Sequence, residues 1–461
     1  MPEFEKPKRH IAMFPWIAMG HITPFIHVAN GLAKRGHSVS ILIPRKAILQ
    51  LGHHNLYPNL IKFQSVSVPQ VDGLPPGAET ASDIDVSPFN PLAVAFQAIL
   101  GLYIFEQVNT LLCTLKPDIV FYDFAHWIPD LAAKIGFKTV FYNVICAAFW
   151  AITIVPARHF PRDRPLTEEE LSEPPKGYPS STVVLRGQEG RTLSTIPLEC
   201  GNTTFDVVIT AAMQGCDAIG TRTCRELEGP VCDYLSAQYN KPVLLSGPVL
   251  PEVPKGKLED KWDAWLAKFK PKSVVFCAFG SQLNLEKEQF EELVLGFEMT
   301  GLPFFIALPK PKRANSIEEA LPEGFVERVG DRGVVYGDWV QQTHILNHPS
   351  VGCFVSHCGF GSMWESLLSD NQIVLVPFLA DQILNARLLT EELKVAVEVE
   401  RGEMGWFCKE DLCKAVKCVM GEGNEVGDMV KRNHEKWKEI FTCAGFMDNY
   451  MDNFVEQLYH L

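Results

Sequence analysis

The sequence predicts an α/β protein made of two doubly wound halves, in which parallel strands alternate with helices. Three observations indicate this class. The chain has 461 residues, more than one ordinary domain usually holds. Strand-like and helix-like runs alternate in both halves of it. Between the halves, Ser246–Lys257 is rich in proline, which is typical of an interdomain linker. We therefore expect two Rossmann-like domains facing each other across a cleft, with ligands at the carboxyl ends of the strands.

The first half begins with a strand, a helix and a second strand. The apolar run His10–Phe14 predicts the first strand, and Pro15 and Gly20 after it predict a turn. Apolar residues at helical spacing predict a helix over Pro24–Lys34, and Val39–Ile43 predicts the next strand. This order within about 35 residues is the beginning of a parallel sheet.

The rest of the first half continues the pattern. Asp118–Tyr122 and Lys138–Tyr142 predict strands, with a helix at Pro129–Ile135 between them. Periodicity is lost over Pro161–Gly201, which predicts a long surface excursion. Order returns at Val207–Ile219.

The second half repeats the alternation after the linker. We expect strands at Ser273–Phe279, Pro303–Leu308, Val351–Ser356, Ile373–Val376 and Val395–Val399, and helices at Leu285–Met299, Ser362–Ser369 and over most of Lys409–Leu461. The predicted domains are residues 1–245 and 261–445, joined by a linker at 246–260. Residues 446–461 are expected to form a C-terminal helix that packs back on the first domain.

Composition excludes several classes of function. The net charge is −13 and the pI is near 5.5, whereas nucleic-acid binding needs clustered Lys and Arg, so no nucleic-acid partner is expected. The charged start of the chain is no secretory signal. The longest apolar run, Cys146–Ala157, falls short of the ~20 residues of a membrane helix. Thirteen scattered cysteines without a CxxC pair indicate free thiols. We expect a cytoplasmic monomer without membrane insertion.

The strongest chemical signal lies between a predicted strand and the helix that follows it. Gly359 and Gly361 let the backbone approach a ligand closely, and the free N–H groups at a helix start suit a diphosphate. His357 and the Ser362 hydroxyl add hydrogen-bond donors for the same oxygens. This is no dinucleotide fingerprint, because Trp364 stands where the third glycine belongs.

Further residues near this loop in the sequence suit the rest of a nucleotide sugar. Glu365, on the same predicted helix, can accept hydrogen bonds from ribose hydroxyls. Trp339 offers a plane on which uracil could stack, and Asp381 and Gln382 offer hydrogen bonds for a sugar. Taken one at a time, an aromatic residue or a histidine is more often part of a core than a ligand.

The whole stretch Trp339–Gln382 resembles the signature box of the plant family-1 UDP-glycosyltransferases. Its 44 residues keep the spacing of that box throughout. The matching positions are Trp339, Gln342, Leu346, His348, Phe354, His357, Cys358, Gly359, Ser362, Glu365, Pro377, Asp381 and Gln382. The resemblance implies the two-domain GT-B fold, in which the first domain binds an acceptor and the second binds a UDP-sugar.

The resemblance also implies a role for each residue of the site. Uracil would meet Trp339, Val340 and Gln342, the ribose Glu365, the diphosphate His357, Gly359, Gly361 and Ser362, and the sugar Asp381 and Gln382. Upstream, Ser281 and Gln282 follow a predicted strand and resemble the other phosphate-side loop of the family.

Two positions depart from the family pattern. Gln341 replaces the usual proline, and Gly361 replaces the asparagine that commonly precedes Ser362. The second departure is similar to the branch of the family that adds a sugar onto an existing sugar of a glycoside. The segments FPWIAMGHITPF, FYDFAHWIPDLA, GPVLPE and VVFCAFGSQ resemble that branch as well, so the resemblance extends over most of the chain.

Two residues of the first half suit general-base chemistry. His21 follows Gly20 in the predicted loop after the first strand, and Asp123 ends another strand, so both belong to the carboxyl edge of the sheet. An imidazole with a pKa of ~6.5 can take a proton from an acceptor hydroxyl, and a carboxylate can orient that imidazole. The resemblance assigns these roles to the same two residues. From position alone, the alternative is that each merely caps a helix.

Neither a metal nor another cofactor is expected. His357, Ser362 and the helix start would hold the charge of the departing UDP, and the UDP-sugar itself is a co-substrate. The DxD pattern Asp83–Asp85 follows no predicted strand, and we interpret it as a solvated loop.

Aromatic and apolar residues crowd the loops of the first half. The candidates for an acceptor wall are Trp16, Met19, Trp127 and Phe149, with Phe378 from the second half and His126 for contact with a sugar.

The sequence thus predicts an inverting glycosyltransferase that moves glucose, xylose or rhamnose from a UDP-sugar onto a sugar hydroxyl of a flavonoid or anthocyanin 3-O-glycoside. The donor stays open, because Gln382 resembles glucose users while the same branch includes xylose and rhamnose users. One alternative is transfer directly to a phenolic or terpenoid aglycone hydroxyl. The other is a degenerate protein that binds a UDP-sugar without catalysis.

Overall fold

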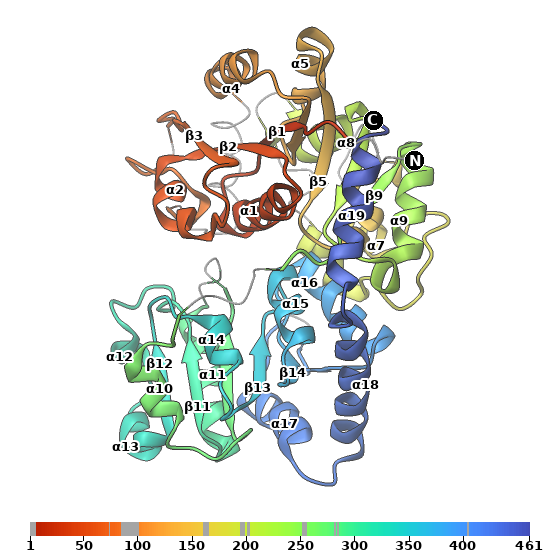
Figure 1. Cartoon of the computed structure of the whole chain (residues 1–461). Coiled ribbons are helices and arrows are strands. Elements are labelled where there is room, and N and C mark those ends of the chain that lie inside the picture. Colours follow the sequence, from red (N-terminus) through yellow and green to blue (C-terminus); the bar gives the residue numbers. More distant parts are fainter. Residues whose placement is uncertain are drawn as a thin grey trace. The chain divides into compact units, whose positions relative to one another are not determined.

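In the computed structural model the chain folds into two compact units (Figure 1). The first unit comprises Met1–Ser180, Glu189–Pro251 and Gly445–Leu461, and the second comprises Ser181–Gln188 and Glu252–Ala444. The structure describes residues 6–72, 74–83, 101–159, 166–193, 199–200, 203–250, 256–280, 283, 285–402 and 405–461. Residues 181–188 lie within the first predicted domain, yet they group with the second unit, where Arg186 pairs with Glu391 at 2.7 Å.

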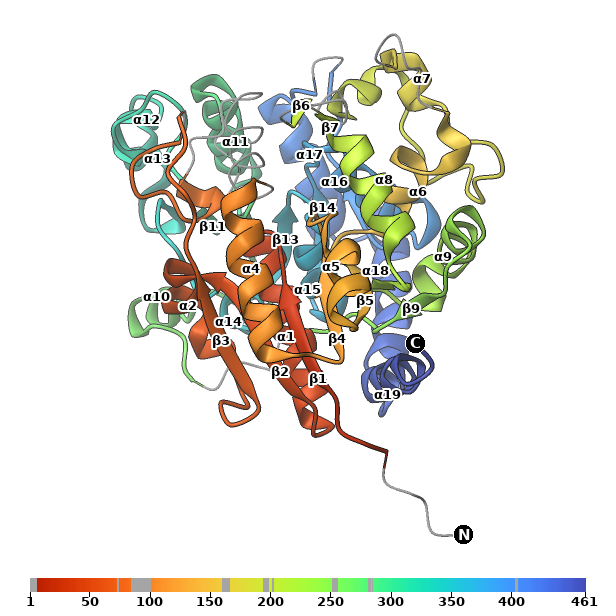
Figure 2. The same ribbon diagram turned by 90° about the horizontal axis from the view of Figure 1, so that it is seen from above.

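The first unit is built on a seven-stranded parallel sheet with the strand order β3-β2-β1-β4-β5-β8-β9 (Figure 2). Its strands are β1 (His10–Phe14), β2 (Ser38–Pro44), β3 (Ile61–Val66), β4 (Ile119–Tyr122), β5 (Lys138–Asn143), β8 (Ala218–Thr221) and β9 (Val243–Leu245). The order reverses between β1 and β4. In such sheets the loops that follow the two central strands diverge, and ligands bind at that point.

Helices connect the strands of the first unit. They are α1 (Met19–Lys34), α2 (Arg45–Leu51), α4 (Leu102–Leu115), α5 (Ile128–Ile135), α6 (Ala147–Thr153), α7 (Glu168–Ser172), α8 (Phe205–Gly215), α9 (Arg225–Tyr239) and α19 (Phe446–Leu458), with a small ribbon of β6 (Glu199–Cys200) and β7 (Thr203–Thr204). α1 begins at Met19 and not at Pro24 as predicted. Pro24 removes only the hydrogen bond to the exposed Gly20, so the helix continues through it. His21 therefore lies in the first turn of α1 and not in a loop.

The helix α19 belongs to the first unit, although it follows the whole second unit in the sequence. It contacts β9 and α1 (Figure 1). Phe454 is fully buried against the rings of Phe121 and Tyr142. Met451 lies over Gly31, where a Cβ atom would come within 2.8 Å of the methionine side chain. The core of the first unit is thus completed by residues from far along the chain.

The second unit is built on a six-stranded parallel sheet with the order β12-β11-β10-β13-β14-β15. Its strands are β10 (Val274–Ala278), β11 (Phe304–Ala307), β12 (Gly333–Tyr336), β13 (Val351–Ser356), β14 (Gln372–Leu375) and β15 (Val397–Glu398). Its helices are α10 (Asp260–Leu266), α11 (Lys287–Thr300), α12 (Ile317–Ala320), α13 (Phe325–Val329), α14 (Gln342–Leu346), α15 (Phe360–Leu368), α16 (Ala380–Arg387), α17 (Lys409–Met420) and α18 (Glu425–Phe441). The order reverses between β10 and β13.

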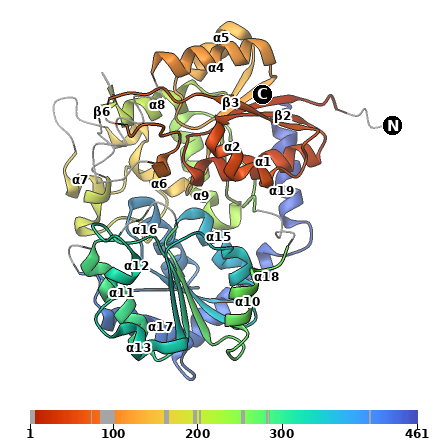
Figure 3. The ribbon, with the colours of Figure 1, turned by 90° about the vertical axis from the view of Figure 1, so that its left-hand side faces the viewer.

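Helices cover both faces of this second sheet (Figure 3). Alternate residues of β10 therefore enter two separate cores: Val275 and Cys277 pack on one face, and Phe276 packs with Trp262 and Phe354 on the other. Burial on both faces explains the continuous apolar run of this strand. Within the residues that the structure describes, no helix is both long enough and apolar enough to span a bilayer.

Candidate functional site

An imidazole–carboxylate pair lies where the strand order of the first unit reverses. His21 comes from the helix after β1, and Asp123 directly follows β4. Because β1 and β4 are parallel neighbours, both residues reach the same sheet edge. The Nδ1 atom of His21 lies 2.7 Å from Oδ2 of Asp123. The structure thus brings together two residues that the sequence separates by 102 positions.

The Asp123 carboxylate is buried and is held by hydrogen bonds to three neighbouring residues. It is 3% exposed, and its Oδ1 accepts hydrogen bonds from the backbone N–H groups of Trp16 at 2.8 Å and Phe124 at 2.7 Å. With Oδ1 occupied, Oδ2 accepts from Nδ1–H of His21, which makes Nε2 the basic nitrogen. The His21 side chain is 18% exposed, so a ligand can reach it.

Neither residue caps a helix. The N-cap of α1 is Ala18, and no side chain accepts a hydrogen bond there. The N-cap of α5, which follows Asp123, is Trp127 and also lacks a side-chain cap. The alternative interpretation from position alone is therefore wrong.

The acceptor candidates fall into two groups. Trp16 packs against Phe124, whose ring lies 5.3 Å from that of His21, so these rings adjoin the pair. Trp127 is buried against Phe14 and belongs to the packing of the unit.

The remaining acceptor candidates are spread over both units. His126 is half-buried, and burial lowers its pKa from the ordinary value. Met19 packs partly buried on the core around α1, and Phe149 stacks edge-on with Trp150 at 5.0 Å. Phe378, in the second unit, contacts Phe279 at 5.4 Å.

A second group of candidate residues lies where the strand order of the second unit reverses, between β10 and β13. Gly280 follows β10 in a left-handed conformation with φ +71°, and a Cβ atom there would lie 3.2 Å from Nε2 of His357. At Gly359 the same contact would be 2.6 Å, so both positions require glycine. Cys358, between His357 and Gly359, is fully buried. Its backbone is held at φ 61°, a strained conformation of the kind found at ligand-binding loops.

His357 and the start of α15 offer donors for an anion. The N-cap Gly359 provides no side-chain cap, so the first N–H groups of α15 are not used by one. Ser362 lies in the first turn, directly after Gly361. The Nδ1 atom of His357 is buried without a hydrogen-bond partner among the described residues, and burial lowers the pKa of His357 to about 4. At neutral pH this imidazole is uncharged, and it offers a hydrogen bond and not a full charge.

The structure joins Gln342 and Glu365 by a hydrogen bond, whereas the resemblance assigns Gln342 to uracil and Glu365 to the ribose. Nε2 of Gln342 donates to Oε2 of Glu365 at 2.6 Å, and the hydroxyl of Thr343 donates to Oε1 at 3.1 Å. The carboxylate of Glu365 is thus oriented by two neighbours at the start of α14. Thr343 was not predicted, because nothing in the sequence marks its contact with a residue 22 positions away.

Trp339 and Val340 have opposite environments. Trp339 is 76% exposed, as a stacking platform must be, while Val340 is buried against the core that contains Leu258. Gln341, at the departure from the family pattern, accepts a hydrogen bond from the backbone N–H of Glu259 at 2.7 Å and donates to the carbonyl of Lys257 at 3.2 Å. Its amide therefore anchors the segment that presents Trp339.

Asp381 and Gln382 lie in the first turn of helix α16. The amide oxygen of Gln382 accepts hydrogen bonds from the backbone N–H groups of Phe378 at 2.9 Å and Leu379 at 3.2 Å. Its amide oxygen is thus occupied, and its amide nitrogen remains as a donor for a sugar. Ser281 and Gln282 lie outside the described residues.

Among the described residues no three His, Cys, Asp or Glu side chains converge as metal ligands do. Asp83 is not solvated as predicted, because its side chain is 15% exposed and pairs with Lys46. The other residues of this pattern, 84 and 85, lie outside the described part of the chain.

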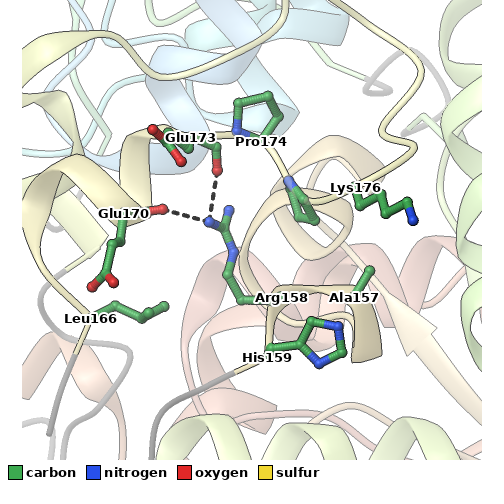
Figure 4. A pocket seen from close by; sticks show the side chains of 9 residues that line it. Ala157, Arg158, His159, Leu166, Glu170, Glu173, Pro174 and Lys176 are labelled. Carbon is green, nitrogen blue, oxygen red and sulfur yellow. Dashed lines mark hydrogen bonds between the residues drawn. The ribbon is translucent and has the colours of Figure 1, made fainter.

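A hollow of about 230 Å³ in the first unit surrounds the buried Arg158 (Figure 4). The guanidinium donates to the carbonyls of Glu170 and Glu173, both at 2.7 Å, and to that of Ile152 at 2.9 Å. Burial lowers the pKa of Arg158 to about 10. Since Ile152 lies in α6, Glu170 in α7 and Glu173 directly after α7, Arg158 ties the two helices together, and α6 carries Phe149.

Comparisons with known proteins agree on one family. A family model described as UDP-glucoronosyl and UDP-glucosyl transferase matches residues 316–433. The chain is 54% identical to the Arabidopsis thaliana anthocyanidin 3-O-glucoside 2'''-O-xylosyltransferase, over 99% of this chain and 98% of the relative. It is 51% identical to UDP-glycosyltransferase 79B9 of the same plant, over 98% and 97% of the two chains.

Solved structures share the fold at low sequence identity. The structure of UGT2 from Phytolacca americana with UDP-2fluoro-glucose and pterostilbene is 22% identical, with a TM-score of 0.73, over 98% of this chain and 100% of that one. A UDP-glucosyltransferase from Polygonum tinctorium is 20% identical, with a TM-score of 0.80, over 99% and 100%.

Proposed function

Because this chain belongs to the plant family-1 UDP-glycosyltransferases, which have the GT-B fold of two parallel Rossmann-like sheets, we propose that it extends a sugar chain. The enzyme would transfer a sugar from a UDP-sugar onto a sugar hydroxyl of a flavonoid or anthocyanin 3-O-glycoside. One observation carries this choice of acceptor: the 54% identity, over nearly the whole chain, to an enzyme named for xylosyl transfer to an anthocyanidin 3-O-glucoside.

The geometry around His21 supports the chemistry of this proposal. Nε2 of His21 would take the proton of the acceptor hydroxyl while the hydroxyl oxygen forms a bond to the anomeric carbon of the donor sugar. The bond from that carbon to the diphosphate oxygen breaks on the opposite side, so the configuration inverts. The Asp123 carboxylate, whose Oδ2 lies 2.7 Å from Nδ1, would stabilise the imidazolium that results.

The second unit would bind the donor and receive the leaving UDP. Trp339 is 76% exposed and would stack on uracil, and the Glu365 carboxylate, held by hydrogen bonds from Gln342 and Thr343, would accept from the ribose. The donors at His357 and at the start of α15 would take up the charge that develops on the diphosphate. We do not retain the alternative of a non-catalytic UDP-sugar-binding protein, because the family is one of transferases and the pair His21–Asp123 is complete.

An acceptor-and-donor matrix tests the proposal. Purified protein is incubated with UDP-glucose, UDP-xylose or UDP-rhamnose and with kaempferol or cyanidin, each as the 3-O-glucoside and as the free aglycone. Mass spectrometry is expected to show a pentose, hexose or deoxyhexose added to the glucosides, with fragments that keep both sugars linked to each other. Modification of free aglycones alone would refute the acceptor assignment and favour direct aglycone glycosylation.

A further inference from the structure

The loop between β14 and α16, residues Pro377–Leu379, is held at three consecutive backbone groups. Gln382 accepts hydrogen bonds from the N–H groups of Phe378 and Leu379. Nη1 of Arg401 donates to the carbonyl of Pro377 at 2.6 Å from the other side. The peptide planes of the β14–α16 loop are thereby fixed, and Asp381 lies two residues after Leu379, in the first turn of α16.

Arg401 is part of a largely buried chain of charges. Its Nη2 donates to Oε1 of Glu398 at 2.8 Å, and Oε2 of Glu398 accepts from Nη1 of Arg387 at 2.6 Å. The side chains of Arg401, Glu398 and Arg387 are 10%, 18% and 11% exposed. Hydrogen bonds between a guanidinium and a carboxylate or a carbonyl are strong, and the planar guanidinium makes them directional.

These charged residues contact both ends of helix α16. Arg387 is the last residue of α16, whereas Pro377 precedes its first turn. Glu398 lies on β15, whose pairing with β14 places it opposite Leu375. Burial raises the pKa of the Cys358 thiol well above its ordinary range, and the carboxylates of Glu398 and Asp381 raise it further. Nδ2 of Asn385, on α16, donates to the carbonyl of Cys358 at 2.9 Å, so the helix held by this network also contacts the His357–Gly359 loop.

We propose that Arg401 is a positioning residue that sets which donor sugar the enzyme accepts, acting through Asp381 and Gln382. This rests on the proposed function. UDP-glucose and UDP-xylose share the whole UDP moiety and differ only by one hydroxymethyl group on the sugar. Discrimination between them needs hydrogen-bonding groups held to within about 0.5 Å, and the β14–α16 loop is fixed by Arg401.

The variant Arg401→Lys tests the proposal. One ammonium group keeps the charge but cannot reproduce the forked contact with both Glu398 and the Pro377 carbonyl. We expect the KM for the preferred UDP-sugar to rise about tenfold and the ratio of kcat/KM between UDP-glucose and UDP-xylose to move toward one. The Kd of UDP alone, measured by calorimetry, should change less than about twofold, because UDP lacks the sugar.

Two further variants complete the experiment. Lys414→Met removes another cation of the second unit, which pairs with Glu400 but is 76% exposed, and it should leave all three quantities unchanged. Glu398→Gln breaks the charge chain and keeps the arginine contact with Pro377, so it should shift the donor ratio in the same direction by a smaller factor. This variant carries the test if Arg401→Lys does not fold.

The outcomes separate the two claims. If wild-type protein transfers no sugar from any donor, the proposed function fails. If wild-type protein is active and Arg401→Lys weakens UDP and UDP-sugar binding by the same factor, Arg401 supports only the general structure of the unit. An unchanged donor ratio in folded Arg401→Lys or Glu398→Gln likewise overturns the inference.

Discussion

At the scale of single residues, Asp123 decides which nitrogen of His21 is basic. In Asp123→Asn the amide oxygen would still accept from the N–H groups of Trp16 and Phe124, which turns the amide N–H₂ toward His21. Nδ1 must then be the acceptor, and Nε2 carries the proton. We expect kcat to fall by about 10²–10⁴ while the Kd of UDP stays the same.

The matched control for this variant is Asp118→Asn. Asp118 precedes β4 and accepts from the backbone N–H of His10 at the opposite sheet edge, so its loss of charge should cost less than about twofold in kcat. Steady-state kinetics with mass detection of the product measures both. Equal losses in the two variants would contradict the role given to Asp123.

The hydroxyl of Thr343 offers a second prediction at this scale. Thr343→Val keeps the shape of the side chain but removes one of the two hydrogen bonds on the Glu365 carboxylate. The Kd of UDP should rise about three- to tenfold, since the carboxylate is then less well oriented for ribose. Thr390→Val, which removes a hydroxyl that donates to the carbonyl of Ala386 on α16, is the control and should leave the Kd unchanged.

Glu228 provides a prediction for pH dependence. It is buried at the kink of α9, accepts from the N–H of Ala148 at 3.0 Å, and burial raises its pKa from 4.5 to about 7. A carboxyl whose pKa is raised by folding stabilises the protein while it is protonated. That stability is lost as the pH rises from about 4.5 to about 7, and it amounts to about 3 kcal/mol.

The variant Glu228→Gln checks this sign. Its melting temperature should approach or fall below that of the wild type at pH 5 and exceed it at pH 8. The exposed Glu435→Gln, on α18, should show the same difference from wild type at both values. A difference for Glu228→Gln that does not grow with pH would exclude the carboxyl as its source.

At the scale of elements, Arg158 links α6 to α7. Arg158→Met would leave the carbonyls of Ile152, Glu170 and Glu173 without their shared donor. We expect the free energy of unfolding to fall by about 2–4 kcal/mol, because a buried polar group without a partner is costly. The KM for the acceptor should rise more than that for the UDP-sugar, since α6 carries Phe149. Lys176→Met, an exposed residue of the same hollow, should change neither in urea titrations and kinetics.

The elements also show which strands can be predicted from sequence. Central strands such as β10 and β13 are buried on both faces, so their residues form continuous apolar runs that predict them. The edge strands β3 and β12 escaped prediction, because each is only partly buried and carries no such run. The sequence places the start of α1 too late, because Pro24 indicates a helix boundary, although the exposed Gly20 tolerates the missing hydrogen bond.

Some residues of the candidate site can likewise be predicted from the sequence, and others cannot. His21, Asp123 and the loop at His357 could be found in advance, because polar residues directly after apolar strands belong to one known edge of a parallel sheet. The contacts of Gln342 with Glu365 and of Arg401 with Pro377 could not. They depend on how helices and loops of the second unit are placed against one another, and sequence spacing holds no information about that.

At the scale of the whole molecule, α19 makes the stability of the first unit depend on a distant segment. Phe454→Ala removes a fully buried ring that contacts Phe121 and Tyr142, at a cost of about 3–5 kcal/mol. We expect urea unfolding, followed by tryptophan fluorescence, to show an earlier transition for the first unit and an unchanged one for the second. The exposed Asn453→Ala is the control. Equal shifts of both transitions would contradict the division into units.

The position of α19 has a consequence for how the protein is made. The strands of the first unit leave the ribosome early, but the helix that covers Phe121 and Tyr142 follows only after Glu252–Ala444. At ~5–20 residues per second, this delay is roughly 10 to 40 s. During that time the second unit can fold, while apolar side chains of the first remain uncovered and open to chaperones. The half that is synthesised first is therefore completed last.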